Sequence, residues 1–373
     1  MPPMVIDRRT FLSAVSAVAI CAGERRVAAS VVPTDAIYAG CHTHTDGGHY
    51  VTLFRLSGVA HARHRLPGRG HGIVYDAHRS RVVVLARRPQ RFAIVIDAES
   101  GDIIDRFEAR ADRHFYGHGV FSRDGRLLYT TENDFDAGRG VIGVRDAARG
   151  FRTVGELPSH GVGPHQMCLL PGGDALVVAN GGIRTHPDSG KAKLNLDSMQ
   201  PSLTIVAAGD GALVERATLD PRLHKLSIRH IDVAPGGEVA VAMQYEGSRQ
   251  DRVPLVALWR RGRIETWHAP PAVERRMRQY AGSIAFDASG AYLAVTCPRG
   301  NMVTLWSAAS GQLLRAVDVE DACGVAAHRL PGAFVVTGAP RGCTRIDATA
   351  GRDTQIEGHV PGRWDNHLAA VGA

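Results

Sequence analysis

The sequence predicts an all-β fold, a seven-bladed β-propeller. A short apolar segment recurs seven times along the chain, starting at residues 71, 118, 165, 230, 283, 324 and 367. Each copy is followed by a turn and by further strand-like segments. Repeats of roughly 40 to 50 residues with several strands each are typical of propeller blades, because one four-stranded sheet cannot bury both of its faces alone.

The segment 113–150 shows the repeating unit most clearly. A strand at 118–122 is followed by an Asp-Gly turn at 123–126, a second strand at 127–131 and a third at 141–145. Strands this short, joined by Asp/Gly turns, favour an antiparallel meander over a helix.

Matching strands follow in the other repeats. Second strands are predicted at 81–86, 126–131, 174–179, 238–243, 291–296 and 333–337. Third strands are predicted at 92–96, 202–206, 255–259 and 303–306.

The seventh repeat is incomplete and needs strands from elsewhere. It begins at His367, and the segments 36–39, 50–56 and 60–64 near the N-terminus supply three candidate partners. Pairing the N-terminal strands with the C-terminal strand closes the ring and leaves no open sheet edge at the joint.

The first residues are typical of an export signal. Arg8-Arg9 precedes an apolar run at 12–22, and small residues at 27–29 offer a cleavage site. The pattern resembles a twin-arginine signal, used by proteins that fold before export. We therefore predict a signal peptide at 1–29, a single propeller domain at 30–373 and a periplasmic location. A membrane anchor is the alternative, but the run is short for a bilayer span.

Composition narrows the function classes. The formal charge of +7 comes from scattered arginines, with no nucleic-acid motif, so we expect no nucleic acid partner. The mature chain has no other segment apolar enough to span a membrane, and we expect a monomer. Cleavage leaves five cysteines, an odd number, so at least one thiol is unpaired within the chain, and the spacing assigns no pairs.

Two insertions interrupt the period. The longer, 180–203, contains Arg184 and His186 and exceeds the usual length of a loop without secondary structure, which is typical of lids and binding loops. The other, 269–280, is charged and is predicted to form a short helix on the rim. We expect both on one face.

Five histidines share one register of the repeat and are the candidate metal ligands. They are His71, His118, His165, His230 and His367. The first strand of each blade lines the central channel, so these imidazoles are expected to converge at one mouth. Three or more neutral imidazoles at one level can bind iron, copper, zinc or nickel. The alternative is that each histidine only bonds the backbone of a neighbouring blade.

Polar residues in the same repeats are candidate supporting or ligand-binding groups. Glu132, Asn180, Gln244 and Glu246 follow second strands, where their side chains could accept hydrogen bonds from imidazole N–H groups. They could equally be strand-end caps. Arg229 beside His230 favours an anion site instead. Arg184 and His186 of the long insertion complete the set.

The segment 41–49 is a weaker metal-site candidate. It contains one cysteine and three histidines, but their spacing fits no standard zinc pattern and a solvated loop is expected.

Several long motifs resemble the domain of unknown function 1513 family. They include RHFYGHGVFS (113–122), YTTEND (129–134), SHGVGPHQM (159–167), LSIRHIDV (226–233) and QYEG (244–247), within a resemblance over about residues 36–371. The resemblance implies a twin-arginine-exported propeller without an established activity, encoded near imelysin-like iron-regulated and di-haem peroxidase-like proteins. It carries over His118, His165 and His230, with Glu132, Asn180 and Glu246.

The sequence therefore predicts a periplasmic propeller that binds iron or copper, or a metal-containing ligand, at a histidine-lined channel mouth, with a role in iron handling and iron-uptake or redox proteins as partners. A metal-assisted hydrolase of lactonase type and a non-catalytic scaffold remain alternatives. No G-x-S-x-G motif is present, which disfavours a serine hydrolase, and no C-x-x-C-H motif for covalent haem.

Overall fold

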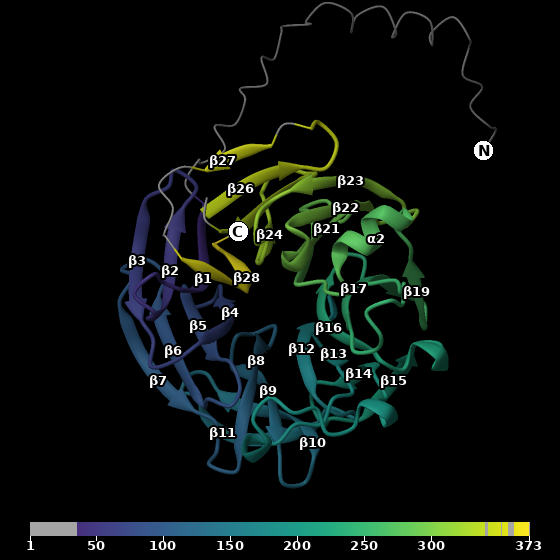
Figure 1. Cartoon of the computed structure of the whole chain (residues 1–373). Coiled ribbons are helices and arrows are strands. Elements are labelled where there is room, and N and C mark those ends of the chain that lie inside the picture. The colour runs from purple at the N-terminus through teal and green to yellow at the C-terminus, as the bar shows by residue number, and fades with distance from the viewer. Residues whose placement is uncertain (1–35, 340–341, 352, 357–361, 373) are drawn as a thin grey trace, which may run out of the picture. The chain divides into compact units, whose positions relative to one another are not determined.

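The computed structural model describes residues 36–339, 342–351, 353–356 and 362–372. These residues form seven four-stranded antiparallel sheets arranged as blades around a central channel (Figure 1). The seven-bladed β-propeller predicted from the repeats is therefore confirmed. The predicted signal peptide at 1–29 lies outside the described residues.

Each blade begins with its innermost strand. Blades 1 to 3 consist of β4 (Gly70–Asp76), β5 (Arg81–Ala86), β6 (Phe92–Asp97) and β7 (Ile103–Glu108); β8 (Arg113–Phe121), β9 (Leu127–Asp134), β10 (Arg139–Asp146) and β11 (Arg152–Pro158); and β12 (Pro164–Leu169), β13 (Ala175–Asn180), β14 (Ser202–Ala207) and β15 (Leu213–Thr218). Blades 4 to 6 consist of β16 (Leu226–Val233), β17 (Val239–Tyr245), β18 (Val256–Arg260) and β19 (Arg263–Trp267); β20 (Ser283–Phe286), β21 (Tyr292–Cys297), β22 (Met302–Ser307) and β23 (Leu313–Asp318); and β24 (Val325–Ala327), β25 (Ala333–Gly338), β26 (Gly342–Asp347) and β27 (Thr354–Ile356).

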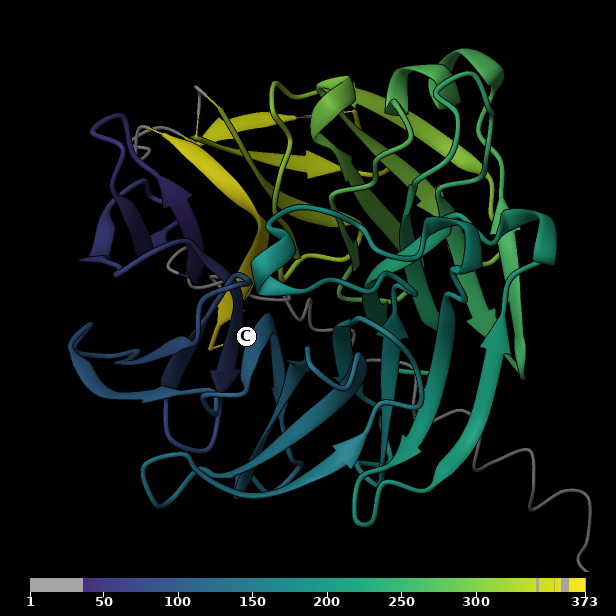
Figure 2. The same ribbon diagram turned by 60° about the horizontal axis from the view of Figure 1, so that its bottom comes forward.

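Blade 7 joins the two ends of the described chain. Its order is β28 (Arg363–Val371), β1 (Ile37–Thr43), β2 (His49–Arg55) and β3 (Ala60–Arg65), with β1 antiparallel to β28. The turned view in Figure 2 shows the yellow β28 beside the purple N-terminal strands. The predicted ring closure is confirmed.

The core lies between neighbouring blades, and the strand sequences follow from that position. Middle strands are covered on both faces and contain continuous apolar runs, such as the fully buried VVVLA at 82–86 of β5. Outermost strands face solvent on one side, so β23 alternates between half-buried and exposed residues. Innermost strands contact one another around the ring and define the channel wall.

The two insertions contain short helical segments. Within 180–203 lie the 3₁₀ turns η1 (Pro187–Ser189) and η2 (Leu196–Ser198). The predicted rim helix is confirmed as α2 (Pro271–Met277), which starts at a proline and is capped at its C-terminus by Arg278 in the left-handed conformation. Two further 3₁₀ turns are η3 (Pro221–Leu223) and η4 (Pro298–Gly300). No helix in the described part of the chain is both long and apolar enough to cross a bilayer.

Candidate metal centre

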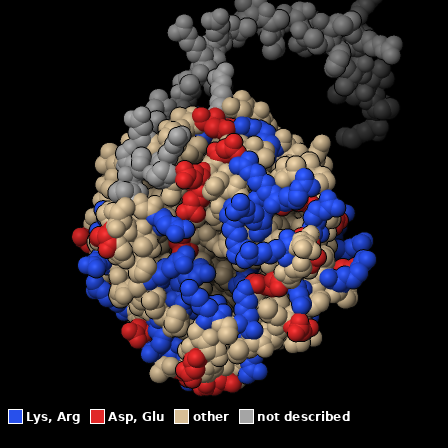
Figure 3. All heavy atoms as spheres, viewed as in Figure 1, with Lys and Arg blue, Asp and Glu red and all other residues tan. Residues whose placement is uncertain are grey.

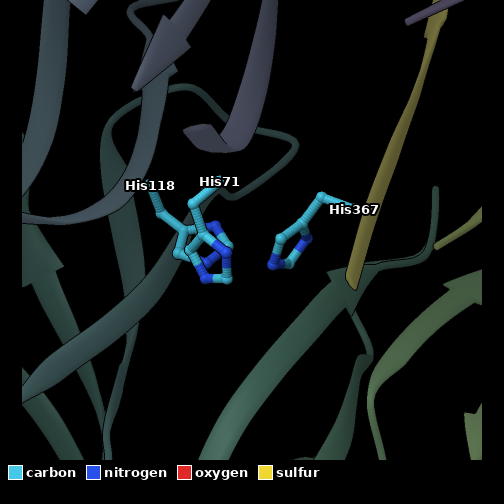
Figure 4. Close-up of side chains that lie close together, drawn as sticks. All are labelled: His71, His118 and His367. Atoms are coloured by element: carbon cyan, nitrogen blue, oxygen red, sulfur yellow. The ribbon is translucent and has the colours of Figure 1, made fainter. Parts of the chain in front are cut away.

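Five innermost strands bring the repeat histidines into contact inside the channel. The ligand candidates are His71 in β4, His118 in β8, His165 in β12, His230 in β16 and His367 in β28. The ring centroids of His118 and His367 lie 4.3 Å apart, and those of His165 and His230 4.7 Å apart. Figure 4 shows the rings of His71, His118 and His367 pointing toward one another from different strands. The five histidines that share one position of the repeat therefore lie next to one another in the folded protein, as predicted.

The cluster lies deeper than predicted. His71, His118, His165 and His230 are buried and His367 is half-buried, whereas a position at the channel mouth was expected. Strands β8, β16 and β28 begin several residues before their histidines, which places the rings along the channel wall rather than at its rim. On one side of the cluster, His165 and His230 line a cavity of about 190 Å³. His118 and His367 line another of about 470 Å³.

Each imidazole has one buried ring nitrogen without a hydrogen-bond partner among the described residues. These atoms are Nε2 of His71, His118, His165 and His367, and Nδ1 of His230. A buried polar atom without a partner costs about 1–3 kcal/mol. The five atoms lie in one cluster, where a bound ion, ligand or water molecule would give them partners.

The imidazoles are held in the neutral form that binds metal. Burial lowers the pKa of His118, His165, His230 and His367 well below the usual range. Nearby histidines and arginines lower the pKa of each ring further, because a second positive charge would be repelled. Burial also lowers the pKa of His71, with part of the shift offset by a carboxylate beside it. At neutral pH the lone pairs are therefore available.

That carboxylate belongs to Asp365, which orients His71. Its Oδ1 lies 2.6 Å from Nδ1 of His71, and its Oδ2 accepts a 2.6 Å hydrogen bond from Nε of Arg69. Burial alone would raise the pKa of Asp365, but His71 and Arg69 hold it well below its usual range. An ionised acceptor places the imidazole proton on Nδ1, so Nε2 of His71 faces the cluster with its lone pair.

The ligand nitrogens of the histidines form two overlapping groups of three. His71, His118 and His367 form one trio and His118, His165 and His230 another, with ligand nitrogens within 4.8 Å of one another in each. A metal about 2.1 Å from each nitrogen separates two opposite ligands by about 4.2 Å, so a pair at the 4.8 Å limit must close by about 0.6 Å to share one ion. His118 belongs to both trios, so the two trios are neighbours.

The cavity above His165 and His230 is rich in positive charge. Its wall includes Arg87, Arg88 and Arg229, and Nη1 of Arg87 lies 3.3 Å from Nδ1 of His71. Burial lowers the pKa of Arg229; the charges of Glu246 and Tyr280 oppose this shift, and those of Arg87 and Arg88 add to it. Burial raises the pKa of Tyr116 in the same wall to about 12, so its hydroxyl remains a donor.

Three of the predicted supporting residues reach this cavity. They are Arg229, Gln244 and Glu246, and Gln244 also donates to the carbonyl of Ala281. Lys193 of the long insertion pairs with Glu246, which brings that insertion to the wall formed in part by Tyr280 of the second insertion. The expectation that both insertions decorate one face is confirmed.

The other four supporting candidates have partners elsewhere. Glu132 accepts a 2.8 Å bond from Arg145 inside blade 2, and Asn180 donates to Ser159 and Thr204. The side chain of His186 contacts Asp136. The chain at Arg184 is fixed through its backbone N–H, which donates to Asn195.

Two further findings concern residues near the ends of the ring. Asp365, absent from the predicted set, lies two positions before His367 on the same strand, and this i, i+2 spacing was the available signal.

The segment 41–49 is not a loop throughout, since Cys41 lies in β1 and His49 in β2, and His42 bonds Thr52. All five described cysteines are free.

Fold and cluster together define the class of protein, a seven-bladed β-propeller with a cluster of five histidines inside its channel. The chain belongs to the family described as "Protein of unknown function (DUF1513)", whose family model matches residues 64–371. No curated protein matches the sequence.

Solved structures with the same architecture are distant in sequence. A chain of Kuenenia stuttgartiensis hydrazine synthase has a TM-score of 0.64 and 15% identity, over 84% of this chain and 95% of that chain. The β-propeller domain of Myceliophteria thermophila Cps50 (Swd1) has a TM-score of 0.59 and 14% identity, over 84% and 96%. At these identities the likeness shows the fold alone.

Proposed function

We propose that this protein binds a transition metal ion, iron or copper, at the five-histidine cluster. The observation that carries the proposal is the set of five neighbouring imidazoles, each with a buried ring nitrogen that has no partner among the described residues. A bound ion accepts these lone pairs and removes the cost of leaving them unpaired.

The donor set supports this choice of metals. Imidazole suits iron, copper, zinc and nickel, whereas magnesium and calcium prefer oxygen. Asp365 lies behind His71 as a hydrogen-bond acceptor, an arrangement that commonly fixes histidine ligands. Because the imidazole ligands are neutral, they do not balance the positive charge of the ion. The carboxylate of Asp365, behind His71, balances part of it.

We further propose that the protein acts in the periplasm, in iron handling. The support is the paired arginines and apolar run near the N-terminus, together with the genomic setting that the family resemblance implies. Periplasmic iron-uptake or redox proteins are the partners that this role requires. The protein is expected to act as a monomer.

Metal binding is favoured over a metal-assisted hydrolase by where the carboxylates lie. A hydrolase needs a base near the metal-bound water. Glu132 pairs with Arg145, Glu246 pairs with Lys193, and Asp365 is held by His71 and Arg69. Each of these three carboxylates is therefore already paired with a cation or an imidazole.

The test is the metal content of protein purified from periplasm without a metal-binding tag. Parent protein should contain about one iron or copper per chain, and a His118→Ala, His165→Ala, His230→Ala variant should contain none. Single His165→Gln protein, which leaves a smaller void, should show at least tenfold weaker affinity on reconstitution.

The control variant removes histidines outside the cluster. His61 and His224 bond the backbone carbonyls of Ala98 and Pro221 and are not part of the cluster, so their alanine variants should keep the parent's metal. A folded parent that takes up neither iron nor copper on reconstitution would overturn the proposal. The histidines would then have a structural role.

A further inference from the structure

The cavity over His165 and His230 carries an excess of positive charge. One carboxylate lines it, that of Glu246, against five basic side chains: Arg87, Arg88, Lys193, Arg229 and Arg299. Figure 3 shows lysines and arginines gathered around the central hollow of the propeller. Like charges this close repel one another, the more so where protein walls reduce the screening by water.

Protein groups compensate little of this charge. Glu246 pairs with Lys193, and its Oε1 lies 3.7 Å from Nη2 of Arg229. Nε of Arg229 is buried with no hydrogen-bond partner in the described part of the chain. Arg299 lies over the ring of Tyr280 at 4.3 Å. Arg88 and Arg299 form no ion pair with any described residue, so donors are in surplus.

The donor types specify the ligand. Guanidinium groups bind carboxylate and phosphate oxygens through two parallel N–H···O bonds, which a monatomic anion cannot accept. The hydroxyl of Tyr116 and the amide of Gln244 add neutral donors to the same wall. A cavity of about 190 Å³ holds a small molecule and excludes a polymer.

We propose that this cavity binds a small oxyanion with two or more negative charges, either a di- or tricarboxylate or a phosphate. His165 and His230 form part of the same wall, so the bound anion lies next to the metal-binding cluster. The inference does not rest on the proposed metal, because the surplus of cations is present in the polypeptide alone.

The test is calorimetric titration of metal-free protein at low salt with tricarballylate and with inorganic phosphate. At least one of them should bind at least tenfold more tightly than acetate. The compound that binds more tightly shows whether the natural ligand is a carboxylate or a phosphate. If neither binds more tightly than acetate, the proposal is wrong.

Variants locate the site. Arg88→Gln and Arg229→Gln should each weaken the anion at least tenfold, whereas Arg126→Gln, which removes an exposed arginine of blade 2, should leave the affinity unchanged. Equal affinity in the parent and folded Arg88→Gln protein would overturn the proposal, and this variant remains informative if Arg229→Gln does not fold.

Metal content separates this inference from the proposed function. Arg88→Gln protein should keep the parent's metal while losing the anion. Loss of anion binding therefore reports on the cavity alone, and loss of metal in the histidine variants reports on the cluster.

Discussion

Asp365 holds His71 through a 2.6 Å contact between Oδ1 and Nδ1, and both residues are buried. Asp365 and His367 lie on one strand, so β28 supplies both a candidate ligand and the group that orients another candidate ligand, His71. This contact links the last blade to the first across the ring joint.

Asp365→Asn should lower metal affinity by a factor of 10 to 100, because the amide no longer fixes the His71 proton on Nδ1. Competition titration against a chromogenic chelator measures the change. Asp76→Asn is the matched control, since Asp76 is also buried and pairs with Arg81 away from the cluster. If both variants lose affinity equally, the loss is one of stability and not of ligand orientation.

Metal-free protein should lose stability as the pH falls below about 6.5. The folded-state pKa of the buried histidines is lowered, so the unfolded chain binds protons that the folded chain does not. Each such histidine contributes about 1.4 kcal/mol between pH 7.5 and 5.5. Urea unfolding at the two pH values should show a loss about 4 kcal/mol smaller in the His118, His165, His230 triple alanine variant. Equal losses would contradict neutral burial of these rings.

Glu132→Gln should destabilise the fold by about 3 kcal/mol without changing metal affinity. Glu132 forms a buried ion pair with Arg145, whose guanidinium also lies near the rings of Phe107 and Phe115. Denaturant unfolding measures the effect. Removing the half-exposed partner of Arg260, by Glu265→Gln, should cost less than about 1 kcal/mol. Lower metal affinity in stable Glu132→Gln protein would restore a supporting role for this residue.

Gly40→Ala should weaken the ring joint. A Cβ at Gly40 would lie 2.6 Å from Cζ3 of Trp364, so the indole must move, at about 1–3 kcal/mol. Gly155→Ala in β11 is the control, because no atom lies within 4 Å of its added Cβ. Thermal unfolding should show a lower Tm for Gly40→Ala than for Gly155→Ala. Equal Tm values for the two variants would mean that the added methyl group at residue 40 fits without a stability cost.

The fold could be predicted because its determinants are local. Alternating and continuous apolar segments, separated by Gly and Asp turns, mark each strand, and their repetition marks each blade. The convergence of His71, His118 and His165 follows from the same register, because equivalent positions of a propeller meet around one axis. The propeller fold and the convergence of the histidines can therefore both be inferred from the spacing of the repeats alone.

The partners of individual polar side chains could not be predicted in this way. The contact between Glu132 and Arg145 depends on the pairing of β9 with β10, and that between Lys193 and Glu246 on the path of a long insertion. Such contacts join residues whose separation follows no repeat. Asp365 escaped notice for a related reason, since its partner His71 lies at the other end of the described chain.

Ring closure through β28 also sets an order of events in biosynthesis. His367 and Asp365 enter the channel only when β28 pairs with β1, a contact between residues at opposite ends of the described chain. A nascent chain that still lacks this strand presents four of the five imidazoles, without the carboxylate that orients His71. At the proposed metal site, complete coordination would therefore follow the pairing of β28 with β1, and an occupied site would show that this pairing had formed.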